Sequence, residues 1–115
     1  MRRDELYVQD MVEALDAIAA FIQGKDREEF RTSELLRSAV LQKLTIVGEA
    51  ASQINRELKA QYPHIEWRQI VRFRNIVVHH YFGLDWDIVW VAATQECPPL
   101  RTKLTTILGA LRGNT

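Results

Sequence analysis

The chain of 115 residues has the size of one domain, and we expect residues 1–115 to form a single helical domain around one modest core. Its 47% hydrophobic and 26% charged residues are ordinary for a globular protein, which argues against extended disorder. Fifteen basic and fifteen acidic side chains cancel. This balance excludes the strongly basic class of nucleic-acid binders, so any contact with RNA must be local.

The first predicted element is a helix over Asp4–Gln23, where apolar residues recur at steps of three and four. Gly24 follows the last apolar position and predicts the end of this helix. Asp26 and Glu29 have the spacing of a capping box, which opens a short turn before Ser33.

The second predicted element is one long helix that begins after Thr32 or Ser33 and ends before Pro63. Its apolar positions continue at helical spacing, as Leu36, Val40, Leu44, Val47, Ala51, Ile54 and Leu58. Gly48 is unfavourable inside a helix by about 1 kcal/mol relative to alanine. A close approach of a neighbouring helix or a functional site would explain it, and packing is the simpler reason.

A third helix is predicted over residues 65–78, although its β-branched run would also suit a strand. We favour a helix because no second strand is available for pairing. Gly83 supplies a stop and Asp85 an N-cap for a fourth helix, which Pro98 and Pro99 interrupt. The apolar residues beyond the prolines belong either to a kinked continuation or to a fifth helix.

These elements predict an all-α protein, an up-and-down bundle of four to five helices joined by short connections. The three tryptophans occur at helical spacing, and we interpret them as packing residues, namely Trp67, Trp86 and Trp90. No segment approaches the roughly 20 apolar residues that span a bilayer, and no signal-peptide run follows Met1. With a single cysteine, Cys97, the chain fits a reducing compartment, and we expect a cytoplasmic protein.

Reactive side chains are densest in residues 72–81, at the end of the third predicted helix, and Arg68 adds to this cluster. Between Tyr62 and Gly83 three arginines accompany one acidic residue, Glu66. We expect a small anion-binding patch here. Within it, Arg74, His79 and Tyr81 offer groups that RNA cleavage can use. A guanidinium stabilises charge on phosphate oxygens, and an imidazole removes the proton of a ribose 2′-hydroxyl or protonates the leaving 5′-oxygen. Such chemistry needs no metal and does not cut DNA, which lacks the 2′-hydroxyl.

The spacing of Arg74 and His79 sets a geometric problem, because on an ideal helix they point about 140° apart. Either the helix loosens near His79, or two subunits combine their residues across a symmetry axis. A dimer would also supply a second His79, so that one imidazole serves as base and the other as acid.

A structural interpretation of the same residues stays open. Arginine and histidine near a helix C-terminus also stabilise the helix dipole, and Tyr81 would also suit a half-buried ring. His80 and His64 have no role that spacing defines, and we leave them out of the site. With three histidines and one cysteine, the sequence indicates no catalytic metal, and no cofactor motif is present.

The chain resembles the HepT-like toxins of the HEPN superfamily over nearly its whole length. The resemblance begins with RRDELYVQDMVEALDAI, continues through LTIVGEAASQI and YPHIEWRQI, and is strongest at RFRNIVVHHYFGLDWDIVW. The last segment holds the family pattern of arginine, four residues, histidine, one residue and tyrosine, in Arg74, His79 and Tyr81. Asn75 and Glu49 also match family positions, with less defined roles.

The resemblance implies a HEPN-like homodimer with an RNA-cleaving groove at its interface and with Arg74 and His79 as the catalytic pair. It also implies a partner, an MNT-type nucleotidyltransferase antitoxin that inhibits the toxin by transferring adenylate to Tyr81. The alternative is a noncatalytic substrate-binding subunit of the nucleotidyltransferase, and a third possibility is a helical scaffold that only binds partners.

Overall fold

The protein is described by a computed structural model that covers residues 2–113, so residues 1, 114 and 115 of the expected domain lie outside the description. All regular structure between residues 2 and 113 is helical. The long helices are α1 (Asp4–Ile22), α3 (Glu34–Gln53), α5 (Trp67–His79) and α7 (Cys97–Leu111). The shorter elements are α2 (Arg27–Thr32), α4 (Arg56–Gln61), the 3-10 turn η1 (Tyr81–Gly83), α6 (Trp86–Val91) and the π-helix η2 (Ala92–Glu96).

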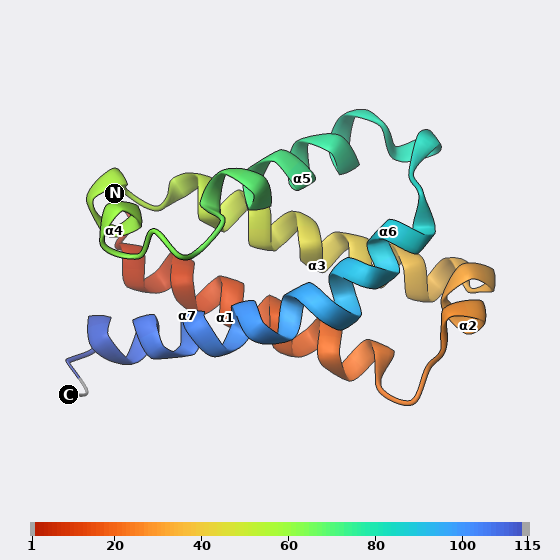
Figure 1. Ribbon diagram of the computed structural model, residues 1–115, viewed down its shortest axis with the longest axis horizontal. Helices are drawn as coiled ribbons and strands as arrows, with labels where there is room; N and C mark the ends of the chain where they lie inside the picture. Colours follow the sequence, from red (N-terminus) through yellow and green to blue (C-terminus); the bar gives the residue numbers. More distant parts are fainter. Residues whose placement is uncertain (1, 114–115) are drawn as a thin grey trace.

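Successive long helices run in opposite directions, which is the predicted up-and-down topology (Figure 1). The central pair is α1 and α3. Helix α5 packs against α3, and α7 packs against α1, so the order across the bundle is α5, α3, α1, α7. The core lies where these faces meet, and its fully buried side chains include Val8, Met11, Leu15, Ile18, Val40, Leu104 and Ile107. The predicted fold class is therefore confirmed.

The first break in the chain has the predicted chemistry. Helix α1 ends at Ile22, and Gly24 adopts a positive φ of 74°. Asp26 and Glu29 form the expected capping box, and the Ser33 side chain accepts a hydrogen bond from the backbone N–H of Leu36 at the start of α3. Local side-chain bonding thus sets the corner between the two central helices.

The prediction of one long second helix was wrong. Helix α3 ends at Gln53, Ile54 adopts an extended conformation, and Asn55 caps a separate helix, α4. The Asn55 side chain accepts hydrogen bonds from the next turn, and its backbone N–H donates to Asp4. The apolar spacing concealed this break, because Ile54 and Leu58 on either side of Asn55 are both buried.

The proline pair does not split the last helical rod. Helix α6, the π-helix η2 and helix α7 follow one another without a gap, and Pro98 and Pro99 lie in the first turn of α7. The wider turns of η2 shift the hydrogen-bonding pattern just before two residues that lack an N–H donor. The last element is thus a continuation with a π-helical irregularity, one of the two predicted alternatives.

Aromatic side chains hold α6 against the rest of the bundle. Phe30 of α2 is 1% exposed, and its ring lies 6.2 Å from that of Trp86 and 5.3 Å from that of Trp90. Trp67 at the start of α5 is buried and donates its indole N–H to the Tyr62 carbonyl. The interpretation of the tryptophans as packing residues is confirmed. No helix within residues 2–113 has the length and apolarity needed to cross a membrane.

Candidate active site

The site begins where α3 and α5 cross, at Gly48 and Arg74. A β-carbon on Gly48 would lie 2.9 Å from Cγ of Arg74, closer still to its Cβ, and 3.3 Å from the carbonyl oxygen of Ile70. Any larger residue at position 48 would therefore collide with the root of the arginine side chain and with the α5 backbone. From the sequence, Gly48 was expected to mark either a close approach of a neighbouring helix or a functional site. In the structure it marks a close approach, and the residue that it contacts is the motif arginine, Arg74.

Arg74 is held in this crossing by Glu49, the residue next to Gly48. Its Nη1 donates to a carboxylate oxygen of Glu49 in an ion pair. The Arg74 side chain is 17% exposed and that of Glu49 is 55% exposed, so the pair lies at the rim of the helix interface. The Nε–H of Arg74 is buried without an acceptor among residues 2–113. One edge of the guanidinium is thus fixed, while its other N–H donors are not taken up by Glu49.

His79 is the last residue of α5 and is exposed. Its side chain makes no hydrogen bond within residues 2–113. Asn75, one helical turn earlier, is also exposed. It lies on the same face of α5 as His79, because four residues turn an α-helix by only about 40° beyond one full turn. Both side chains are therefore open to a molecule that approaches α5 from outside.

Arg74 and His79 do not converge within one chain. Helix α5 stays regular up to His79, and the chain leaves it only at His80. The loosening considered from the sequence is absent from the described helix, so the separation of about 140° remains. The structure brings together Arg74 and Glu49 on one side of α5 and Asn75 with His79 on another.

Tyr81 lies just beyond α5, in the turn η1, and is 42% exposed. Its ring packs edge-on against Phe82, at 5.4 Å between ring centres, and against Trp86, at 6.3 Å. The motif tyrosine is therefore supported by aromatic neighbours at an accessible corner of the molecule.

A broad groove of about 980 Å³ lies beside the outer face of α5. Its cationic side chains are Lys59 of α4 with Arg68 and Arg72 of α5, against one acidic residue, Glu66. Asn75 lines its far end and Ser52 its α3 wall. We call it the basic groove. The sequence indicated the two arginines as part of an anion-binding patch, but Lys59 joins them only through the α3–α4 break that the apolar pattern concealed.

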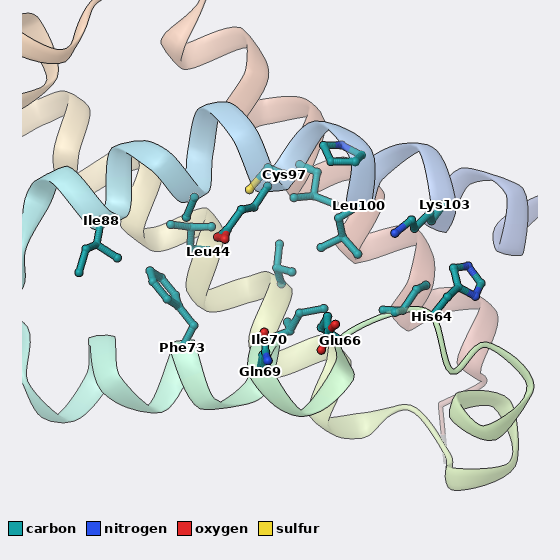
Figure 2. Close-up of a pocket in the computed structure, with 16 residues that line it drawn as sticks. Leu44, His64, Glu66, Gln69, Ile70, Phe73, Ile88, Cys97, Leu100 and Lys103 are labelled. Atoms are coloured by element: carbon teal, nitrogen blue, oxygen red, sulfur yellow. The ribbon is translucent and has the colours of Figure 1, made fainter.

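A second groove, of about 450 Å³, lies on the other side of α5, between it and α6–α7. Figure 2 shows Phe73 and Ile70 of α5 facing Ile88, Cys97 and Leu100 across it, and Leu44 of α3 also lines it. None of the predicted site residues lines this apolar groove. Burial raises the pKa of the Cys97 thiol to about 12, which keeps it protonated near neutral pH and unsuited to act as a nucleophile.

Metal ligands do not gather anywhere in the part of the chain that the structure describes: no three histidine, cysteine, aspartate or glutamate side chains lie close enough to share an ion. The predicted site residues along α5 and its neighbours offer guanidinium, imidazole, amide, carboxylate and phenol groups.

Comparison with known proteins places these features in a family. Residues 11–107 match the family described as Ribonuclease HepT-like. The chain is 29% identical over 107 residues to MJ1380 of Methanocaldococcus jannaschii, whose name describes a candidate RNase; the match covers 92% of this chain and 98% of that protein. It is 33% identical over 97 residues to a protein of Thermococcus cleftensis whose name describes a candidate ribonuclease HepT; the match covers 84% of this chain and 88% of that protein.

One further relative is longer. MJ0434 of Methanocaldococcus jannaschii, named as a gamma-glutamylcyclotransferase and candidate RNase, is 30% identical over 115 residues; these cover 99% of this chain and 52% of that protein, so the chain spans about half of it. No solved structure matches this chain significantly. The match to the family spans α5 and the crossing at Gly48, and the chain belongs to the HepT-like ribonuclease family.

Proposed function

We propose that the protein is a metal-independent endoribonuclease and the toxin of a toxin–antitoxin pair, with Arg74 and His79 as its catalytic residues. The observation that carries the proposal is the fixed position of Arg74 between Gly48 and Glu49, in a chain of a ribonuclease family. A guanidinium fixed on one edge presents its remaining N–H donors to phosphate with little loss of entropy.

The reaction would proceed by attack of the ribose 2′-oxygen on the adjacent phosphorus. An imidazole of His79 removes the 2′-hydroxyl proton, the bond between the 2′-oxygen and phosphorus forms, and the bond to the 5′-oxygen breaks as that oxygen takes a proton from a water molecule. The imidazolium then returns its proton to the hydroxide that is left. The products are a 2′,3′-cyclic phosphate and a 5′-hydroxyl. Arg74 stabilises the charge that develops on the phosphate oxygens, and Asn75 lies beside the path as a supporting donor. DNA would not be cut, since it has no 2′-hydroxyl.

A homodimer would unite the two catalytic groups. Arg74 and His79 diverge on a regular helix, so one protomer would supply Arg74 and its partner His79. Apolar side chains near His79 are uncovered in a single chain, with Val78 54% and Phe82 101% exposed. A second copy would remove these side chains from water. Light scattering should therefore report twice 13.4 kDa.

Inhibition would act through Tyr81, to which a cognate nucleotidyltransferase antitoxin would transfer adenylate from ATP. The accessible position of Tyr81 beside η1 supports this role, because an attached phosphate would bring negative charge close to His79. Mass spectrometry after co-expression should find adenylate on Tyr81 and none on a Tyr81→Phe protein. Adenylate at another residue, or equal inhibition of Tyr81→Phe, would show that the antitoxin acts by masking the site.

The catalytic proposal is tested by cleavage of RNA in the presence of a chelator. We expect wild-type protein to produce cyclic-phosphate ends without added metal, and His79→Ala to lose cleavage while keeping its fold. His80→Ala, a histidine variant at the next position, serves as the matched control. If His79→Ala cuts RNA at the wild-type rate, the enzyme proposal fails and a substrate-binding subunit of a nucleotidyltransferase becomes the better interpretation.

A further inference from the structure

The outer face of α5 carries a polar stripe that differs from the side that holds Arg74. Counted at 100° per residue, the side chains of Arg68, Arg72, Asn75 and His79 fall within about 60° of one another. All of these are exposed. Arg74 lies about 140° from His79 and faces α3 instead.

The cationic side chains of this stripe, and Lys59 of α4 beside it, have no internal bonding partner among the described residues. No ion pair or side-chain hydrogen bond within residues 2–113 involves Arg68, Arg72 or Lys59. Arg74, by contrast, is paired with Glu49. Free cations lining a concave surface bind phosphate without first giving up an internal partner.

The stripe and the basic groove form one path. Lys59 of α4 adds a third cation across the groove from α5, and Asn75 lines the end nearest to His79. From Arg68 to His79 the helix rises on the order of 16 Å, the length of several stacked nucleotides. The groove therefore fits an extended polyanion better than a single small anion.

The lining of the groove favours contact with backbone phosphate over reading of bases. Its one aromatic residue, Trp67, is 8% exposed and is held by a hydrogen bond to the chain, so it offers no free ring for stacking. Phosphate contacts position a strand without selecting its sequence.

From these observations we infer that the basic groove binds the RNA backbone on one side of the cleaved bond and leads the strand along α5 to His79. This inference rests on the proposed ribonuclease function and adds Lys59, Arg68 and Arg72 as substrate-positioning residues that take no part in the chemistry. Arg74 would then contact the phosphate that is cleaved, and the groove would hold phosphates further along the strand.

The test measures binding of a short fluorescent single-stranded RNA to His79→Ala protein over a series of salt concentrations. Adding Lys59→Gln, Arg68→Gln and Arg72→Gln together should weaken binding roughly tenfold at low salt. It should also reduce the slope of log K against log salt by about 2, since each lost phosphate contact contributes about 0.7 for a single strand. Lys103→Gln, an exposed cation of α7 outside the groove, is the matched control and should leave both quantities unchanged.

Kinetics on the protein with His79 intact give a second readout. The triple variant should raise KM roughly tenfold while kcat changes less than about twofold, because the removed contacts are made equally before and during the reaction. If the triple variant has unaltered RNA affinity and an unaltered salt slope, the proposal that the basic groove binds the RNA backbone is wrong, even if wild-type protein cleaves RNA. Cleavage that does not depend on His79, with binding that still depends on the groove, overturns only the catalytic proposal. A wild-type protein that neither binds nor cuts RNA overturns both.

Discussion

Helix α5 has two faces that differ in how their arginines are held. On the inner face, Arg74 passes over Gly48 and pairs with Glu49, and it is largely covered. On the outer face, Arg68 and Arg72 are exposed and make no ion pair within residues 2–113. This difference leads us to propose different roles for the two kinds of arginine. A fixed guanidinium suits stabilisation of the transition state, whereas free guanidinium groups suit electrostatic attraction of the substrate.

The largest expected effect comes from removing the fixed arginine. Arg74→Ala should lower kcat by roughly 10²–10³-fold, as loss of a preorganised donor does in other enzymes. Arg72→Ala, the matched change on the outer face, should act mainly on KM. Steady-state cleavage of a fluorescent RNA gives both constants. If the two variants alter the same constant by the same factor, the two faces do not differ in function.

The next effect concerns the crossing itself and is measured as stability. Gly48→Ala should lower the free energy of unfolding by about 1–3 kcal/mol, because the new methyl group meets Arg74 near the α5 backbone. Gly109→Ala is the control, since no atom lies within 4 Å of its added carbon; it should raise stability by up to about 1 kcal/mol through helix propensity alone. Urea unfolding followed by circular dichroism compares them. Equal gains would show that α3 and α5 do not approach closely at position 48.

A smaller effect is expected at Glu49, which we interpret as a positioning residue for Arg74. Glu49→Gln keeps the shape but removes the charge and should lower kcat roughly tenfold, while stability changes by less than about 1 kcal/mol because the pair is partly exposed. In the Arg74→Ala background the same change should have no further effect on kcat. Additive losses in the double variant would instead indicate that Glu49 acts independently of Arg74.

The smallest effect concerns Cys97, a buried residue that lines the apolar groove. Since burial raises its pKa from 9.0 to about 12, the folded protein keeps the thiol proton while an unfolded chain loses it near pH 9. Native protein should therefore react slowly with a thiol reagent at pH 8 and rapidly in denaturant. Its stability should decline as pH rises above about 9, and this contribution should be absent in Cys97→Ala. Rapid reaction of the native thiol would show that the residue is accessible.

Local chemistry made much of this molecule predictable. The capping box at Asp26 and Glu29, the cap at Ser33 and the cap at Asp85 depend on neighbours in sequence, and all are present. The end of α3 was missed because a buried stripe runs through a break that only the Asn55 side chain and its bond to Asp4 reveal. An asparagine followed two residues later by glutamate was the available signal for this cap.

The sequence was enough to name the residues of the candidate site, but it did not predict how they are arranged in space. The motif named Arg74, His79 and Tyr81, and the glycine at 48 stood out by its helix propensity, yet no spacing rule joins positions 48 and 74. Only the packing of α3 on α5 brings them together. Lys59 was missed for the same reason, because its place beside Arg68 and Arg72 depends on the turn between α3 and α4.

The most direct test of the shared site is subunit complementation. Arg74→Ala and His79→Ala proteins are each expected to be inactive, but a mixed dimer would hold one intact combination of Arg74 from one protomer and His79 from its partner. Co-refolding equal amounts should form about half mixed dimers with one working site each, and so restore roughly a quarter of wild-type cleavage. An inactive mixture in which mass spectrometry detects the mixed dimers would contradict a site shared in this way.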